Sequence, residues 1–156
     1  MDIGTRRAPR VIVIDERVEH GTAGRMRIWI VEDEPAAASL AADLCEANGA
    51  TPSLYRLPLT FLTALRTSPP PEAVVLDWRL EHELSAGPFL ATRHRYPRLP
   101  VIYWTGSMAS VLPAMISDDR WTLVIEKAAG TAPFEEALAW ALHRPVSEAP
   151  TGSAVG

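Results

Sequence analysis

The order of elements along the chain constrains its fold more strongly than any single motif. Five segments have the character of short strands, at residues 28–31, 53–56, 74–76, 101–104 and 123–125. Helical segments follow them, at residues 35–47, 60–66, 88–95, 108–117 and 134–143. Most of the strand segments are continuously apolar, which is typical of strands buried on both faces. This alternation predicts an α/β fold, with a doubly wound five-stranded parallel sheet in a three-layer sandwich.

The length and composition fit one domain of this kind. The chain has 156 residues, of which 47% are hydrophobic and 22% are charged, as in ordinary globular proteins. We expect a domain over residues 26–144, an N-terminal extension at 1–25 and a flexible tail at 145–156. The extension is either partly disordered, or translated upstream of a start at Met26, or an extra strand formed by residues 11–14 at a sheet edge.

Composition also limits the partners and the location. The net charge of −4 argues against a nucleic-acid-binding domain, which usually carries a basic face. The basic cluster at residues 93–98 is expected to be a solvated helix end rather than a nucleic-acid site. No apolar run is long enough to span a membrane, and the first ten residues lack the character of a signal peptide. The single cysteine, Cys45, cannot form an internal disulfide, so we expect a cytoplasmic protein.

The strand Val74-Val75-Leu76 runs directly into Asp77, and a loop to Gly87 is predicted to follow. A carboxylate at this place lies at the carboxyl end of a buried strand, where open α/β sheets form their sites. Asp77 is either the centre of a site or an ordinary strand-ending aspartate. For a lone aspartate in this position, the second case is the more common. The residues at the other strand ends decide between the two interpretations.

Four further polar residues end neighbouring strands, and parallel topology brings them to the same sheet edge as Asp77. They are Glu32 and Asp33 after the first strand, Thr105 after the fourth and Lys127 after the fifth. Carboxylates that lie close together repel one another unless a proton or a cation joins them, and an all-oxygen ligand set suits Mg²⁺. A carboxylate can also act as a nucleophile toward a phosphoryl group, whose oxygens a hydroxyl and an ammonium would bind.

Each of these residues also has a purely structural interpretation. Glu32 and Asp33 can cap the helix that follows them, Thr105 can cap the next helix, and Lys127 can be a solvated strand-end lysine. The occurrence of all of them at strand ends on one sheet edge favours the functional interpretation.

The ordered set resembles the receiver domain of two-component response regulators, the CheY-like family with a flavodoxin-like fold. Residues 28–35 are similar to its opening strand and acidic pair, and 75–77 to its phosphoacceptor strand. Thr105-Gly106 is similar to its hydroxyl residue followed by a small residue, and Lys127 to its lysine. The resemblance covers about residues 26–143.

This resemblance implies a role for each residue. Asp77 would accept a phosphoryl group from a sensor histidine kinase or a phosphotransfer protein. Glu32, Asp33, Asp77 and the backbone carbonyl of Arg79 would hold Mg²⁺. Thr105 and Lys127 would bind phosphoryl oxygens after the transfer, and the resulting conformational change would be read by a downstream protein.

Some positions depart from the family pattern. Val124 stands where the family usually has an aromatic switch residue, for which Tyr103, Trp104 or Trp121 are candidate substitutes. Ala128 replaces the family's proline after the lysine. The loop after Asp77 is about two residues longer than usual.

We therefore expect a stand-alone phosphoacceptor and not an enzyme, with self-dephosphorylation as its only turnover. The residues after His143 are too few for a DNA-binding helix-turn-helix module, so output would occur through protein–protein contact or by passing the phosphoryl group onward in a relay. A homodimer through the last helix or through residues 11–14 is compatible with the sequence. The first alternative is a receiver-like interaction module that works without phosphorylation. A second alternative is an aspartate-nucleophile phosphohydrolase. It is ranked lower because such enzymes need a second acid two residues after the nucleophile, and Arg79 occupies that position.

Overall fold

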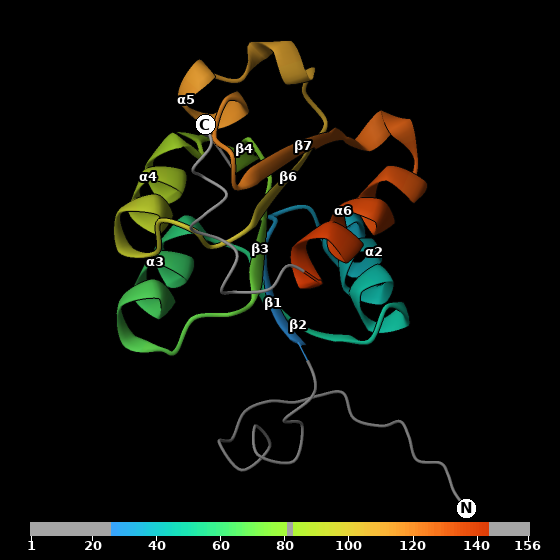
Figure 1. Ribbon diagram of the computed structural model, residues 1–156, viewed down its shortest axis with the longest axis horizontal. Coiled ribbons are helices and arrows are strands. Elements are labelled where there is room, and N and C mark those ends of the chain that lie inside the picture. The colour runs from blue at the N-terminus through green and yellow to red at the C-terminus, as the bar shows by residue number, and fades with distance from the viewer. Residues whose placement is uncertain (1–25, 81–82, 144–156) are drawn as a thin grey trace, which may run out of the picture.

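Five parallel strands form one sheet in the computed structural model, which describes residues 26–80 and 83–143 (Figure 1). The strands are β1 (Met26–Val31), β2 (Ala50–Tyr55), β3 (Ala73–Leu76), β6 (Val101–Thr105) and β7 (Thr122–Glu126). Their order across the sheet is β2-β1-β3-β6-β7, and every neighbouring pair is parallel. This confirms the predicted fold class. The predictions for residues 1–25 and 144–156 lie outside the described residues.

Helices cover both faces of the sheet, as Figure 1 shows. One layer contains α2 (Pro35–Ala47) and α6 (Ala132–Leu142), and the other contains α3 (Pro58–Thr67), α4 (Ala86–Arg95) and α5 (Ala114–Ser117). Because successive strand side chains point to opposite faces, Ile28 and Ile30 pack in the α2/α6 core. Trp29 and Val31 pack in the other core.

The first helix and second strand show how the chain begins the fold. Helix α2 has the predicted bounds, and Gly49 follows it with a φ of +82°, a conformation that closes helices and favours glycine. Strand β2 begins three residues earlier than predicted and contains Pro52. It is an edge strand, where proline is tolerated because one side of the strand needs no ladder hydrogen bond.

The segment after Asp77 was predicted to be a loop to Gly87, and this is wrong at residues 79–80 and 83–84. It contains two short antiparallel strands, β4 (Arg79–Leu80) and β5 (Glu83–Leu84). The amide of Ser85 donates a hydrogen bond to the carbonyl of Trp78 at 2.8 Å and so closes the hairpin at its base. The buried side chain of Leu80 anchors the hairpin in the core next to α4.

The predicted helix at residues 108–117 is divided in two. A 3-10 turn, η2 (Ala109–Val111), comes first, and the four-residue helix α5 follows it. Pro113 stands between them in an extended conformation, with a ψ of 150°. Proline cannot donate a backbone hydrogen bond and disfavours a helical residue before it, so one continuous helix cannot form.

The expectation of a solvated helix end at residues 93–98 is wrong for Arg93. Its side chain is only 13% exposed, and the guanidinium binds Asp119 at 2.8 Å, between Nη2 and Oδ2. It also donates to the carbonyls of Leu99 at 2.7 Å and Trp121 at 3.1 Å. Arg93 thus joins the end of α4 to the loops that precede β6 and β7.

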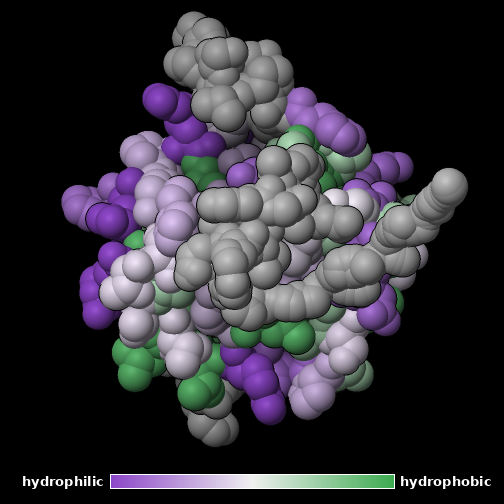
Figure 2. Space-filling view, turned by 90° about the horizontal axis from the view of Figure 1, so that it is seen from below, coloured by the Kyte–Doolittle hydropathy of each residue, from purple (hydrophilic) through white to green (hydrophobic). Residues whose placement is uncertain are grey.

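The surface of the described region is mixed in character. The side of the molecule seen in Figure 2 carries hydrophilic residues interspersed with smaller hydrophobic patches. Among residues 26–80 and 83–143, no helix is long and apolar enough to cross a lipid bilayer.

Candidate functional site

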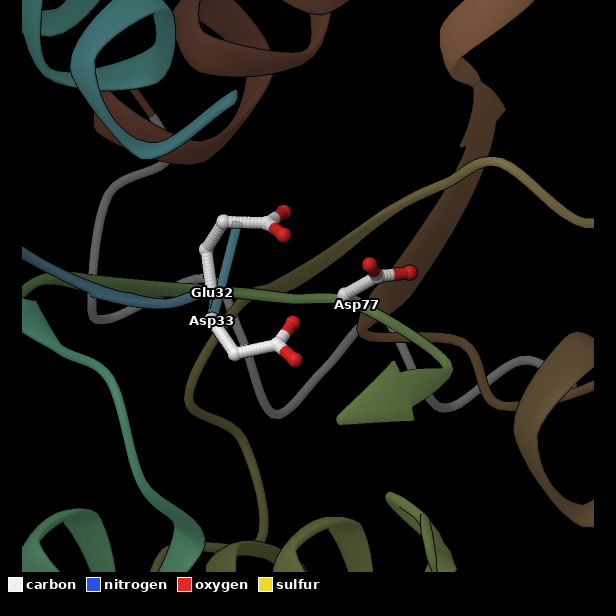
Figure 3. Close-up of side chains that lie close together, drawn as sticks. All are labelled: Glu32, Asp33 and Asp77. Carbon is white, nitrogen blue, oxygen red and sulfur yellow. The ribbon is translucent and has the colours of Figure 1, made fainter. Parts of the chain in front are cut away.

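Three carboxylates meet at the carboxyl ends of two neighbouring strands. Glu32 and Asp33 directly follow β1, and Asp77 directly follows β3. The last residues of these two strands are paired, so the chain segments that follow them begin side by side. Side-chain oxygens of Glu32, Asp33 and Asp77 lie within 4.8 Å of one another. In Figure 3 the side chains of Glu32 and Asp33 extend toward Asp77.

The ammonium of Lys127 bridges two of these carboxylates. Strand β7 ends at the residue before it, and Lys127 opens the 3-10 turn η3 (Lys127–Ala129). Its Nζ lies 2.9 Å from Oε1 of Glu32 and 3.2 Å from Oδ2 of Asp77. Lys127 is also the only lysine in a sequence with 15 lysine and arginine residues. A solvated strand-end lysine is therefore the wrong description of this residue.

Burial and charge shift the pKa values of the bridged groups. Burial raises the pKa of Glu32, and the charge of Asp77 raises it further, so that these effects outweigh the hydrogen bond from Lys127. Burial lowers the pKa of Lys127, but its hydrogen bonds and charge interactions with Glu32 and Asp77 outweigh burial and raise it. The ammonium is thus held in its charged form, while the ionised form of Glu32 is disfavoured.

A pH dependence of stability follows from the raised pKa of Glu32. The folded state retains the Glu32 proton to a higher pH than the unfolded state, for which the ordinary pKa is 4.5. Stability should therefore fall as the pH rises from about this value through the folded-state pKa. We expect urea denaturation of the metal-free protein to show this loss relative to Glu32→Gln. Parallel pH profiles for the two proteins would contradict the assignment.

Only one of the two carboxylate oxygens of Asp77 has a hydrogen-bond partner among the described residues. Its Oδ2 accepts from Lys127, whereas its Oδ1 is buried and has no hydrogen-bond partner among the described residues. Buried polar atoms are normally paired, so an unpaired carboxylate oxygen indicates a place for a cation or a ligand. The donor set consists of oxygens alone, which fits a hard divalent cation such as Mg²⁺.

Glu32 has a structural role as well. Its Oε2 accepts a hydrogen bond from the amide of Glu34 at 3.2 Å, where the chain turns into α2. The expectation that the acidic pair caps this helix is thus met in part, by Glu32. A carboxylate near a helix N-terminus also interacts favourably with the helix dipole. The other oxygen of Glu32 binds Lys127.

Of the two remaining predicted residues, Thr105 lies at the same sheet edge, whereas Arg79 lies in the separate two-stranded sheet of β4 and β5. Thr105 ends β6 and is fully buried, and its hydroxyl accepts a hydrogen bond from the amide of Ser107 at 3.0 Å. Arg79 lies two residues beyond Asp77 in β4, and its side chain is exposed. The structure thus brings Glu32, Asp33, Asp77 and Lys127 into one cluster, and Thr105 ends the strand next to the one that leads to Asp77.

The three candidate substitutes for the aromatic switch residue lie in different places. Tyr103 is fully buried, and its hydroxyl lies 2.9 Å from that of Ser85, with which it shares a hydrogen bond. Burial raises the pKa of this tyrosine. Trp121 precedes β7 and so lies at the opposite sheet edge from Asp77. Trp104 contacts the cluster, through Lys127.

Comparison with solved structures identifies this architecture. A response regulator receiver protein from Sinorhizobium medicae has a TM-score of 0.68 at 16% identity, over 78% of this chain and 97% of that one. Response regulator protein TrrA from Thermotoga maritima, in complex with Mg²⁺ and BeF, has a TM-score of 0.65 at 18% identity, over 75% of this chain and 99% of that one. The receiver domain of a sensor histidine kinase from Pseudomonas aeruginosa, with magnesium in its active-site cleft, has a TM-score of 0.63 at 16% identity. This match covers 74% of this chain and 96% of that one.

The sequence matches no protein-family model and no curated protein. At the identities found among the solved structures, the likeness establishes the fold. The chain has the fold of CheY-like response regulator receiver domains, as the resemblance in its sequence implied.

Proposed function

We propose that this protein is a response-regulator receiver that accepts a phosphoryl group on the carboxylate of Asp77. The proposal is carried by the environment of this one side chain. Asp77 is buried, its Oδ1 has no hydrogen-bond partner in the described part of the chain, and its Oδ2 faces an ammonium. Two further carboxylates lie beside it.

In the proposed transfer, an oxygen of Asp77 forms a bond to phosphorus while the bond from phosphorus to the donor breaks. The electron pair of that bond leaves with the donor. Lys127 and the hydroxyl of Thr105 would bind phosphoryl oxygens by hydrogen bonds that the negative charge strengthens. Mg²⁺ would be held by Glu32, Asp33, Asp77 and the backbone carbonyl of Arg79, and it would supply positive charge that offsets the repulsion between carboxylate and phosphoryl oxygens.

The proposed donor is a sensor histidine kinase or a phosphotransfer protein, and the proposed output is contact with a downstream protein. The protein would serve as a phosphoacceptor and not as an enzyme, with self-dephosphorylation as its only turnover. No nucleic-acid or membrane partner is proposed. A cytoplasmic location and a homodimer through α6 remain predictions from the sequence.

The test is incubation of the full chain with acetyl phosphate and Mg²⁺, followed by intact-mass measurement. We expect one phosphoryl group per chain, and no adduct when Mg²⁺ is removed with a chelator. An unmodified chain under these conditions would favour a phosphorylation-independent interaction module, for which the exposed Arg79 beside the site is the supporting observation. Repeated turnover of phosphomonoesters would favour a phosphohydrolase.

A further inference from the structure

The side chain of Trp104 lies behind the site on the α2/α6 face of the sheet. Trp104 is the residue before Thr105 in β6, and it is 3% exposed. Its ring packs against Phe134 of α6, with 4.8 Å between the ring centroids and 42° between their planes. The strand and the helix therefore fix the orientation of the indole ring.

The indole ring also faces the ammonium that bridges the carboxylates. Nζ of Lys127 lies 5.3 Å from the centroid of the Trp104 ring, within the range of cation–π attraction. The same atom lies 2.9 Å from Glu32 and 3.2 Å from Asp77. The ammonium thus lies between carboxylate oxygens and an aromatic face that is buried against Phe134.

The buried indole N–H of Trp104 indicates which part of this side chain matters at the site. Nε1 is buried and has no hydrogen-bond partner among the described residues, although buried tryptophans usually find one. Phenylalanine would offer an aromatic face without leaving a buried donor unpaired. Tryptophan is, however, the strongest cation–π partner among the aromatic side chains, so its ring face accounts for its presence beside Lys127.

We propose that Trp104 is the positioning residue of the site and that it holds the ammonium of Lys127 against Glu32 and Asp77. A lysine side chain has a flexible stem, and that of Lys127 is 21% exposed, so its ammonium has a route into solvent although its two carboxylate partners are buried. The ring of Trp104 opposes that movement. For phosphoryl transfer, which rests on the proposed function, this places the ammonium where the phosphoryl oxygens must arrive.

The test uses the fact that Lys127 is the only lysine in the chain. Protein labelled with ¹⁵N-lysine should give one side-chain ammonium signal, and its hydrogen exchange with water reports how firmly that ammonium is held. In the metal-free full chain we expect Trp104→Leu to accelerate this exchange about fivefold or more, and Trp104→Phe to accelerate it less. Trp29→Leu is the matched control, because Trp29 is equally buried but packs in the opposite core.

A second measurement leaves the packing unchanged. Fluorinated tryptophans keep the shape of the ring but weaken the negative potential on its face, so exchange at Lys127 should accelerate with each added fluorine. The same labelling in Trp104→Phe should have no such effect. An ammonium signal unchanged by fluorination, or an equal effect of Trp29→Leu in a folded protein, would overturn the proposal.

These readouts need neither a phosphodonor nor Mg²⁺, so they separate the two proposals. If Lys127 responds to Trp104 as expected but the chain accepts no phosphoryl group, the positioning role stands and the proposed function fails. If the chain is phosphorylated and Lys127 does not respond, the positioning role fails alone.

Discussion

Replacement of Asp77 by asparagine is expected to abolish acceptance of a phosphoryl group from acetyl phosphate in the presence of Mg²⁺. The amide keeps the size and polarity of the buried side chain, but it lacks the charge and the nucleophilic oxygen that form an acyl phosphate. Lys127 retains its second partner, Glu32, in this variant, so the fold should persist. The measurement is intact mass, in which the wild type gains one phosphoryl group and Asp77→Asn gains none.

Asp43→Asn is the matched control for this experiment. Asp43 is an exposed carboxylate of α2, outside the cluster around Asp77. We expect this variant to be phosphorylated at the rate of the wild type, which would show that loss of one acidic residue is not itself responsible. An adduct of the same stoichiometry on Asp77→Asn would exclude Asp77 as the phosphoacceptor.

The sheet and the position of the site could be predicted because both depend on a short-range rule. Continuous apolar runs become parallel strands, and residues that directly follow such strands must lie on one sheet edge. Glu32, Asp33, Asp77 and Lys127 obey this rule, and the structure brings their side chains together. No knowledge of side-chain packing was needed to place them.

The features that could not be predicted depend on contacts between distant segments. Arg93 lies among other basic residues and looks solvated, because its partner Asp119 belongs to a later loop. Trp104 is one of three candidate substitutes for the switch residue in the sequence, and only the packed structure shows its face toward Lys127. The β4–β5 hairpin has strands of two residues each, which are too short to give a hydrophobic period.

The largest loss of stability is expected from Arg93→Leu. The guanidinium binds Asp119 through two nitrogens, at 3.1 Å from Nε and 2.8 Å from Nη2, and it stacks over the ring of Phe89 at 5.5 Å. Its removal leaves the largely buried carboxylate without its main partner, and several backbone carbonyls lose a donor. We expect the free energy of unfolding to fall by about 3 kcal/mol and Tm by about 10 °C.

Arg98→Leu is the control, since Arg98 belongs to the same basic cluster but is exposed. Its effect on the free energy of unfolding should stay within about 0.5 kcal/mol. The double variant Arg93→Leu/Asp119→Leu should lose less stability than the sum of its single variants, because it leaves no unpaired charge. Equal effects of Arg93→Leu and Arg98→Leu would contradict the structural role of Arg93.

The same pair should make the fold sensitive to acid. Burial raises the pKa of Asp119, but hydrogen bonds from Arg93 and Thr122 outweigh burial and hold it below the ordinary value of 3.8. The resulting stabilisation is fully present above the ordinary pKa and is lost as the pH falls through the lower pKa of the folded state. Urea denaturation from pH 7 to pH 3 should therefore show a steeper acid loss for the wild type than for Asp119→Asn. If both proteins lose stability along the same curve, the carboxylate of Asp119 does not contribute through its charge.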